Sequence, residues 1–159
     1  KSRNKTLPAV EDWASVLKNI RQPLQSLQYL EKPARIRALR ELSAQRIRSS
    51  QPIDQMLDLD GFAAQVAGVR GVLTISNTTA HLAGALGVPC VVILDNGSIT
   101  NWPDHGDTTP LYPSIRLIRR GRDNWATTLR HGWRTLRSLI SPQEEISMQS
   151  SSMKSSETA

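Results

Sequence analysis

Residues 71–89, which read GVLTISNTTAHLAGALGVP, decide the fold class of this chain. The opening GVLTI is a continuous apolar run, which is typical of a strand covered on both faces. Hydroxyl and amide side chains then predict a tight turn at residues 76–79, followed by a helix from about Thr79 to Leu86. Gly87 is placed to end this helix as its C-cap. The next apolar run, residues 89–94, predicts a second buried strand.

The segments on either side continue this alternation of strands and helices. Further helices are predicted at residues 8–20, 33–48, 61–69 and 125–140, and further strands at 23–30, 53–57 and 114–120. Such alternation indicates βαβ units and a mostly parallel sheet. The fold class we expect is therefore α/β, with a Rossmann-like, doubly wound sheet that binds its ligands at the carboxyl ends of the strands.

The length of 159 residues predicts one folded domain, residues 1–140, followed by a disordered Ser-rich tail at residues 141–159. Cys90 is the one cysteine and lies in an apolar run. An intrachain disulfide is therefore excluded, and a buried thiol in a reducing compartment is expected. No apolar run approaches the roughly 20 residues that span a bilayer. We expect a cytoplasmic protein.

Positive charge flanks a central stretch that has none. Residues 1–50 hold eleven Lys and Arg against four Asp and Glu, residues 111–140 hold seven Arg against one Asp, and residues 71–110 hold no Lys or Arg. The net charge of +6 suits a phosphate-bearing ligand, an anionic membrane surface or nucleic acid. The alternative is that these arginines simply lie on solvent-exposed helix faces and bind no ligand. Nucleic acid is not expected, because no aromatic side chains are interleaved with the basic residues at 35–48.

The turn at residues 76–79 is the part of the sequence that most clearly indicates a binding site. The first N–H groups of a helix have no intrahelical partner and lie at its positive end, so they form an anion site. Four polar side chains could add hydrogen bonds to phosphate oxygens: Ser76, Asn77, Thr78 and Thr79. The alternative is an ordinary helix N-cap. Small residues behind the turn would let the helix pack tightly on the sheet: Ala80, Ala83, Gly84 and Ala85.

This run resembles the Asp-Thr-x-x-x-His-Leu-Ala-x-Ala-x-Gly-x-Pro signature of heptosyltransferase-like glycosyltransferases. It is closer still to the glycosyltransferase halves appended to tetratricopeptide-repeat proteins. Four other segments resemble the same family in order and spacing: Lys5-Thr6-Leu7-Pro8, Ser26-Leu27-Gln28, Asp58-Leu59-Asp60, and Tyr112-Pro113-Ser114-Ile115-Arg116-Leu117 with its following Asp123-Asn124-Trp125. The resemblance covers residues 1–140.

The resemblance implies the C-terminal, nucleotide-sugar-binding half of a GT-B enzyme that transfers a sugar with inversion. The donor diphosphate would be bound by Lys5, Ser76, Asn77, Thr78 and Thr79. His81, which on its own is more often a core residue, would be the catalytic residue, donating to a diphosphate oxygen and offsetting charge on the leaving group without a metal. The nucleoside or sugar would be bound by Ser26, Gln28, Asp95 and Asn96. Trp102 and His105 would contact substrate from the loop at 95–113.

Simpler interpretations exist for several of these residues. Lys5 could be a surface lysine, Ser26 and Gln28 could be ordinary strand-end polar residues, and Asn96 with Gly97 could form a simple turn. No metal-ligand spacing is present, so neither a metal nor a cofactor is expected.

GT-B chemistry takes place between two halves of the enzyme. The resemblance implies that the first strand of this domain and the N-terminal, acceptor-binding half lie outside the chain. The expected partners are therefore a nucleotide-diphosphate sugar and that acceptor half, with an anionic membrane surface as a further candidate. We expect the chain to be incomplete for catalysis alone, since one half cannot orient both substrates. The alternative is a non-catalytic module that binds a nucleotide sugar or a protein.

Overall fold

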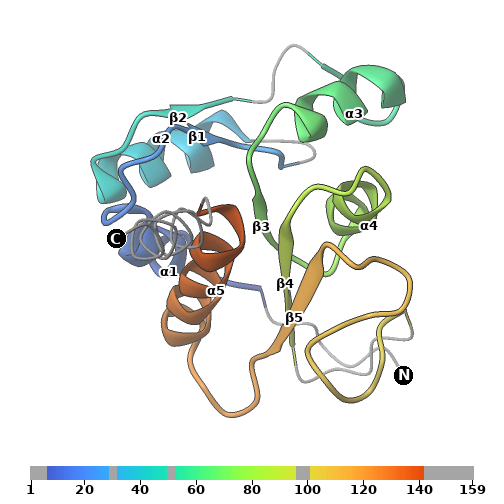
Figure 1. Cartoon of the computed structure of the whole chain (residues 1–159). Helices are drawn as coiled ribbons and strands as arrows, with labels where there is room; N and C mark the ends of the chain where they lie inside the picture. Colours follow the sequence, from blue (N-terminus) through green and yellow to red (C-terminus); the bar gives the residue numbers. More distant parts are fainter. Residues whose placement is uncertain (1–6, 29–31, 50–52, 96–100, 142–159) are drawn as a thin grey trace, which may run out of the picture.

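Three parallel strands run through the centre of the molecule in the order β3-β4-β5 (Figure 1). They are β3 (Val72–Ile75), β4 (Cys90–Leu94) and β5 (Ile115–Arg119). A second parallel sheet pairs β1 (Leu24–Gln25) with β2 (Ile47–Arg48). The computed structural model describes residues 7–28, 32–49, 53–95 and 101–141. The predicted α/β class with parallel strands is confirmed.

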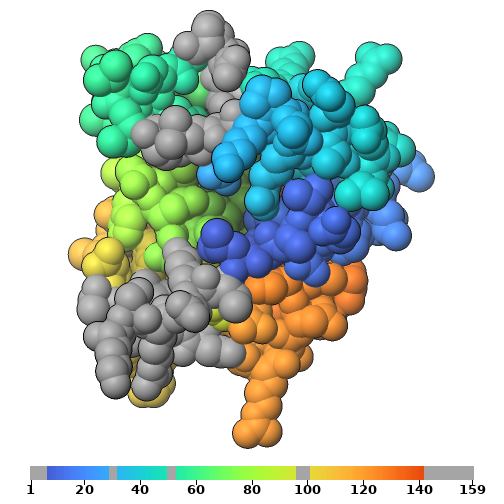
Figure 2. Space-filling model, turned by 180° about the vertical axis from the view of Figure 1, so that it is seen from behind, coloured from blue at the N-terminus to red at the C-terminus, as the bar shows by residue number. Residues whose placement is uncertain are grey.

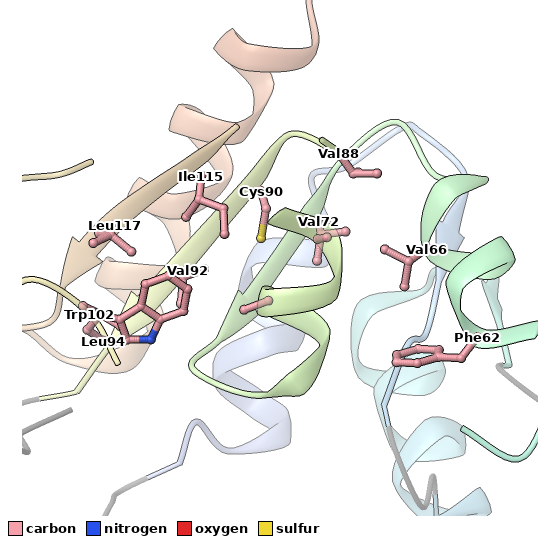
Figure 3. Close-up of a cluster of buried hydrophobic side chains, with 12 residues drawn as sticks. Phe62, Val66, Val72, Val88, Cys90, Val92, Leu94, Trp102, Ile115 and Leu117 are labelled. Atoms are coloured by element: carbon pink, nitrogen blue, oxygen red, sulfur yellow. The ribbon is translucent and has the colours of Figure 1, made fainter. Parts of the chain in front are cut away.

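Helices cover both faces of the three-stranded sheet (Figure 1). α3 (Leu59–Ala67) and α4 (Thr78–Ala85) lie on one face, and α1 (Val10–Leu17) and α5 (Trp125–Ile140) lie on the other. Successive side chains of a strand point to opposite faces. Accordingly Cys90 and Val92 join the cluster under α3 and α4 (Figure 3), while Val91 and Ile93 join the cluster under α1 and α5. This explains why every residue of β4 is buried.

α1 lies between the part of the molecule that holds the β1–β2 sheet and the part that holds the three-stranded sheet. Seen from behind, it lies between α2 (Pro33–Ser43) above and the orange residues of the C-terminal part below (Figure 2). Its buried Val16 packs in the same cluster as Leu129 and Leu136 of α5. α5 is amphipathic, with these leucines inside and arginines outside. Across the described ranges, no helix combines the length and the apolar character needed to cross a bilayer.

The helix predicted for residues 33–48 is shorter than expected. α2 ends at Ser43 because Ala44 adopts a left-handed conformation, with φ of 52° and ψ of 32°. The chain then extends, and Ile47 pairs with Leu24 in the parallel β1–β2 sheet. Ile47 is buried and Arg48 is exposed. The predicted helix therefore included one apolar residue, Ile47, whose burial comes from a strand.

The strand predicted for residues 53–57 is wrong. The carboxylate Oδ1 of Asp54 accepts hydrogen bonds from the N–H groups of Met56 and Leu57, at 2.9 and 3.2 Å, and this closes a turn. Both apolar side chains of the turn are exposed, Met56 by 68% and Leu57 by 87%. Of the apolar residues that suggested a short strand, Ile53 is partly buried against the core, whereas Met56 and Leu57 face solvent. The predicted tail at 141–159 lies outside the described residues apart from Ser141.

Candidate functional site

The turn after β3 is built around Asn77, which is the N-cap of α4. Its Oδ1 accepts a hydrogen bond from the N–H of Ala80 at 3.1 Å, and its Nδ2 donates to Thr74 Oγ1 at 3.0 Å. Both ends of the amide are thus used within the protein, as the N-cap interpretation requires. A role for Asn77 in binding a diphosphate stays a prediction.

The next two residues of α4 present the first N–H groups of the helix. Thr78 and Thr79 follow the N-cap directly, so their N–H groups precede the first donor of the helical ladder. Thr78 is exposed, whereas the side chain of Thr79 is buried. The site thus offers backbone donors at the positive end of a helix, an arrangement that favours an anion.

An aromatic cluster covers His81, one turn into α4. The Trp102 indole stacks on the imidazole, with ring centroids 4.7 Å apart and ring planes 10° from parallel. The Tyr112 ring approaches at 67°, and its hydroxyl lies 3.3 Å from Nδ1 of His81. The ring of His81 is therefore held by a stack on one side and by a polar contact at one nitrogen.

Trp102 also connects this cluster to the turn after β3. Its indole Nε1 donates to Ser76 Oγ at 2.9 Å. The side chain is 5% exposed and belongs to the core cluster that includes Leu94 (Figure 3). Trp102, which the sequence suggested as a substrate contact from a long loop, is instead largely buried in the core. It contacts the turn through its hydrogen bond to Ser76 and contacts α4 through its stack on His81.

Tyr112 is the member of the cluster that sequence reasoning missed as a site residue. Its ring packs against Gly84, where an added Cβ would lie 2.4 Å from Tyr112 Cγ. Gly84 follows His81 by three residues, so both lie on the same face of α4. The predicted small-residue face therefore exists at Ala80, Ala83 and Gly84, but it contacts an aromatic ring as well as the sheet. Ala85, expected on this face, is exposed.

The loop that carries Trp102 is fastened along the edge of β5. The N–H of Leu117 donates to the carbonyl of Asp107 at 2.7 Å. The guanidinium group of Arg119 donates to the carbonyls of Pro103 and Gly106. These bonds fix the loop on both sides of His105, which is itself exposed. The position of Trp102 therefore depends on β5 rather than on the loop alone.

Asp95, the residue that follows β4, forms an ion pair. Its Oδ1 lies 2.8 Å from Nη2 of Arg120, and Nε of Arg120 donates to the same oxygen at 2.8 Å. The Arg120 guanidinium also lies 5.0 Å from the centre of the Trp125 ring. Asp95 therefore has a clear structural partner, and its predicted contact with ribose or sugar hydroxyls stays a prediction.

The remaining predicted residues follow β1 or lie outside the described part of the chain. Ser26 and Gln28 follow the carboxyl end of β1, where the N–H of Gln28 lies 3.4 Å from Ser26 Oγ. Lys5 and Asn96 fall outside the described residues. The structure therefore brings together Ser76, Thr78, Thr79 and His81.

Two hollows lie elsewhere, at the amino ends of β1 and β2. Their volumes are about 450 and about 380 Å³. They share Gln45, Arg46 and Arg48, the first adds Arg40 and Ile47, and the second adds Arg21, Gln22, Pro23, Leu24 and Ala44. No acidic residue lines either hollow. This surface, which we term the arginine hollow, is separate from the residues around His81.

Cys90 is a core residue. It is fully buried in β4, and burial raises the pKa of its thiol to about 12. A thiol of this kind stays protonated and is a poor nucleophile near neutral pH. Within the described ranges, no group of three or more His, Cys, Asp or Glu residues is arranged to hold a metal ion.

Comparison with known proteins gives one partial likeness. Over 107 residues the chain is 34% identical to Protein FlbA of Caulobacter vibrioides (strain ATCC 19089 / CIP 103742 / CB 15). The match covers 67% of this chain but 17% of the length of FlbA. No protein-family model matches the sequence, and no solved structure matches it.

Proposed function

We propose that this chain is the donor-binding half of an inverting glycosyltransferase of the heptosyltransferase-like, tetratricopeptide-repeat-linked kind. The observation that supports this most directly is the arrangement after β3. There the first N–H groups of α4, the hydroxyl of Ser76 and the imidazole of His81 come from adjoining residues at the carboxyl end of a parallel strand. This is where an open α/β sheet binds its ligands.

In this proposal the donor diphosphate accepts hydrogen bonds from the N–H groups of Thr78 and Thr79 and from the exposed hydroxyl of Thr78. During transfer an acceptor oxygen attacks the anomeric carbon of the sugar, and the bond from that carbon to the diphosphate oxygen breaks. Negative charge grows on the departing diphosphate. Fixed donors at a helix start, together with the imidazole, stabilise that charge without reorganising. The acceptor half of the enzyme would supply the base that takes the acceptor proton.

The finer fold that we propose is a doubly wound sheet of six strands. The standard order of such a sheet is 3-2-1-4-5-6. The observed orders β2-β1 and β3-β4-β5 fit it if one further strand lies between β1 and β3. Leu24 of β1 and Leu73 of β3 pack against the same cluster, which supports placing the two sheets side by side in this way.

Nucleotide titration tests the proposal. The purified chain would be titrated with UDP, ADP and GDP by calorimetry, in parallel with Thr78→Ala and His81→Ala. We expect one nucleotide to bind and each change to weaken binding by roughly 1–3 kcal/mol, the usual cost of losing a hydrogen bond to a charged group. Ser138→Ala and His131→Ala are control variants, because both residues are exposed and lie on α5, which covers the other face of the sheet.

Two results would count against the proposal. If the folded chain bound none of the three nucleotides at about 1 mM, the donor site would be rejected, and a protein-binding module would become the better interpretation. If the controls weakened binding as much as Thr78→Ala and His81→Ala, the bound nucleotide would lie elsewhere. A non-catalytic nucleotide-sugar module is distinguished by turnover, since it would bind donor but transfer no sugar when the acceptor half is supplied.

The arginine hollow supports a second candidate function, docking on an anionic membrane. Arg21, Arg46 and Arg48 are exposed and have no salt-bridge partner among the described residues. Each basic residue near an anionic lipid surface contributes about 1 kcal/mol of attraction. The hollow lies at the amino ends of β1 and β2, whereas the proposed donor site follows the carboxyl end of β3, so the two proposed functions use different residues.

Vesicle binding tests this second candidate. Phosphatidylserine vesicles should bind the wild-type chain at low salt and should bind the Arg21→Glu/Arg46→Glu variant much more weakly. Pure phosphatidylcholine vesicles should bind neither chain. Arg134→Glu/Arg137→Glu on α5 makes the same charge change on exposed residues and serves as the control. Equal loss with both double variants would indicate general charge attraction and would reject a role for the hollow.

A further inference from the structure

We propose that Tyr112 and Trp102 are positioning residues that hold the neutral His81 ring with its proton on Nε2. The motif around His81 suggested where the imidazole lies along the chain. It did not indicate what sets the ring plane or the tautomer, and these decide whether an imidazole nitrogen can donate a hydrogen bond.

The ring plane of His81 is set by Trp102. The two rings are stacked with 10° between their planes. Trp102 is itself immobilised, because it is buried and its Nε1 donates to Ser76 Oγ. Rotation of the imidazole away from this plane would lose the stack. A largely buried indole that also bonds to the turn after β3 therefore holds the His81 ring in a fixed position relative to the start of α4.

The orientation within that plane is set by Tyr112. A flip of the imidazole exchanges the nitrogen and carbon positions, and the phenol favours the orientation that places Nδ1 3.3 Å from its oxygen. Gly84 permits this approach, since any larger residue there would meet the Tyr112 ring. The hydroxyl of Tyr112 is thus fixed by packing against α4, the helix that carries His81.

The chemistry of the contact determines the tautomer. A phenol donates well to a neutral imidazole nitrogen, and a neutral imidazole carries one proton. When Tyr112 donates to Nδ1, the proton of the ring resides on Nε2. Across the described residues, the polar side chain that contacts the ring is this phenol and not a carboxylate. His81 is thereby prepared as a donor. That it donates to a diphosphate rests on the proposed function, whereas the tautomer does not.

Nitrogen NMR of the full chain labelled with ¹⁵N-histidine tests the tautomer directly. At about pH 8, where an ordinary imidazole is neutral, the two ring nitrogens have separate shifts that report which one is protonated. We expect His81 to be held with the proton on Nε2. Tyr112→Phe, which keeps the ring packing, should turn this into a mixture of tautomers. His105 and His131 are exposed and provide internal controls that should not change.

The stack is tested with a conservative and a disruptive change. Trp102→Phe should keep most of the Nε2–H form, because a ring still covers the imidazole, and Trp102→Leu should lose more of it. A wild-type His81 protonated on Nδ1, or a tautomer that does not respond to Tyr112→Phe, would overturn the inference.

Nucleotide titration of Tyr112→Phe then separates this inference from the proposed function. If a nucleotide binds the wild-type chain, Tyr112→Phe should weaken it about twofold to tenfold, the loss expected when one hydrogen bond is no longer pre-oriented. An unchanged affinity would overturn the link between tautomer and ligand. If no nucleotide binds the wild-type chain, the proposed function fails, and the NMR result still decides the tautomer.

Discussion

Asp95 and Arg120 pair across the carboxyl ends of β4 and β5, with both Nε and Nη2 of the arginine 2.8 Å from one carboxylate oxygen. The Asp95 side chain is 6% exposed and that of Arg120 is 19% exposed, so the pair is largely removed from water. The N–H of Arg120 also donates to the carbonyl of Leu94 at 2.9 Å. The pair therefore joins the two strand ends beside the proposed donor site.

We expect Arg120→Met to lower the free energy of unfolding by about 3 kcal/mol, because it leaves a nearly buried carboxylate without its partner. Adding Asp95→Asn should recover part of that loss, since the double variant removes the charge that Arg120 no longer offsets. Urea unfolding of the two single variants and the double variant measures this. Strictly additive losses would show that the ion pair is not the reason for the cost of Arg120→Met.

Gly84→Ala should destabilise the fold and disturb His81 together. The new methyl group would lie 2.4 Å from Tyr112 Cγ and 2.8 Å from Ile115 Cδ1. Overpacking of this kind costs about 1–3 kcal/mol, more than the roughly 1 kcal/mol that alanine gains over glycine in a helix. Thermal unfolding measures the loss, and the ¹⁵N spectrum of His81 should change with it. A more stable protein with an unchanged spectrum would show that Tyr112 does not pack closely on α4.

The strands of the central sheet and α4 could be predicted because the sequence around them is locally consistent. The apolar run before Ser76 and the one beginning at Pro89 each became a strand, and Gly87 ends the intervening helix region with φ of +70°. Each of these features depends on neighbouring residues. The alternation of helix and strand then implies parallel pairing, which the register Val72↔Cys90 confirms.

The aromatic cluster could not be predicted, because its members are joined by contacts between distant parts of the chain. Trp102 and Tyr112 come from the segment between β4 and β5, which has no periodic pattern. The hydrogen bonds from Arg119 and Leu117 place that segment on the edge of β5, and nothing in the residues themselves indicates this register. The sequence therefore indicated the helix that carries His81, but not the packing of Trp102 and Tyr112 against its ring.

The end of α2 shows the other kind of failure, in which a local conformation overrides a propensity. Arginine, leucine and glutamate favour helix, so the pattern continued to Arg48. Ala44 nevertheless takes a left-handed conformation, and the residues beyond it pair with β1. Tertiary pairing thus decided the boundary.

The left-handed conformation at Ala44 leads to a stability prediction with a clear sign. An alanine with φ of 52° is strained by its Cβ, and glycine relieves that strain. Ala44→Gly should raise the free energy of unfolding by about 1 kcal/mol. Ala38→Gly, within the same helix, should lower it by about 1 kcal/mol. Urea unfolding of both variants checks the pair, and equal destabilisation would show that α2 continues through Ala44.

The buried thiol of Cys90 predicts how stability changes at high pH. Burial raises its pKa from 9.0 to about 12 in the folded chain, so the folded state holds its proton over a range in which the unfolded state releases it. Stability from this group is fully present below pH 9 and is lost as the pH rises toward 12, by up to roughly 1 kcal/mol per pH unit. Cys90→Ala should be less stable at pH 7 because of the cavity it leaves. Its stability should nevertheless decline less steeply between pH 9 and 11 than that of the wild-type chain, in urea unfolding at each pH. Parallel declines would contradict a thiol that remains protonated in the folded core, and fast alkylation of the native chain near pH 8 would contradict it independently.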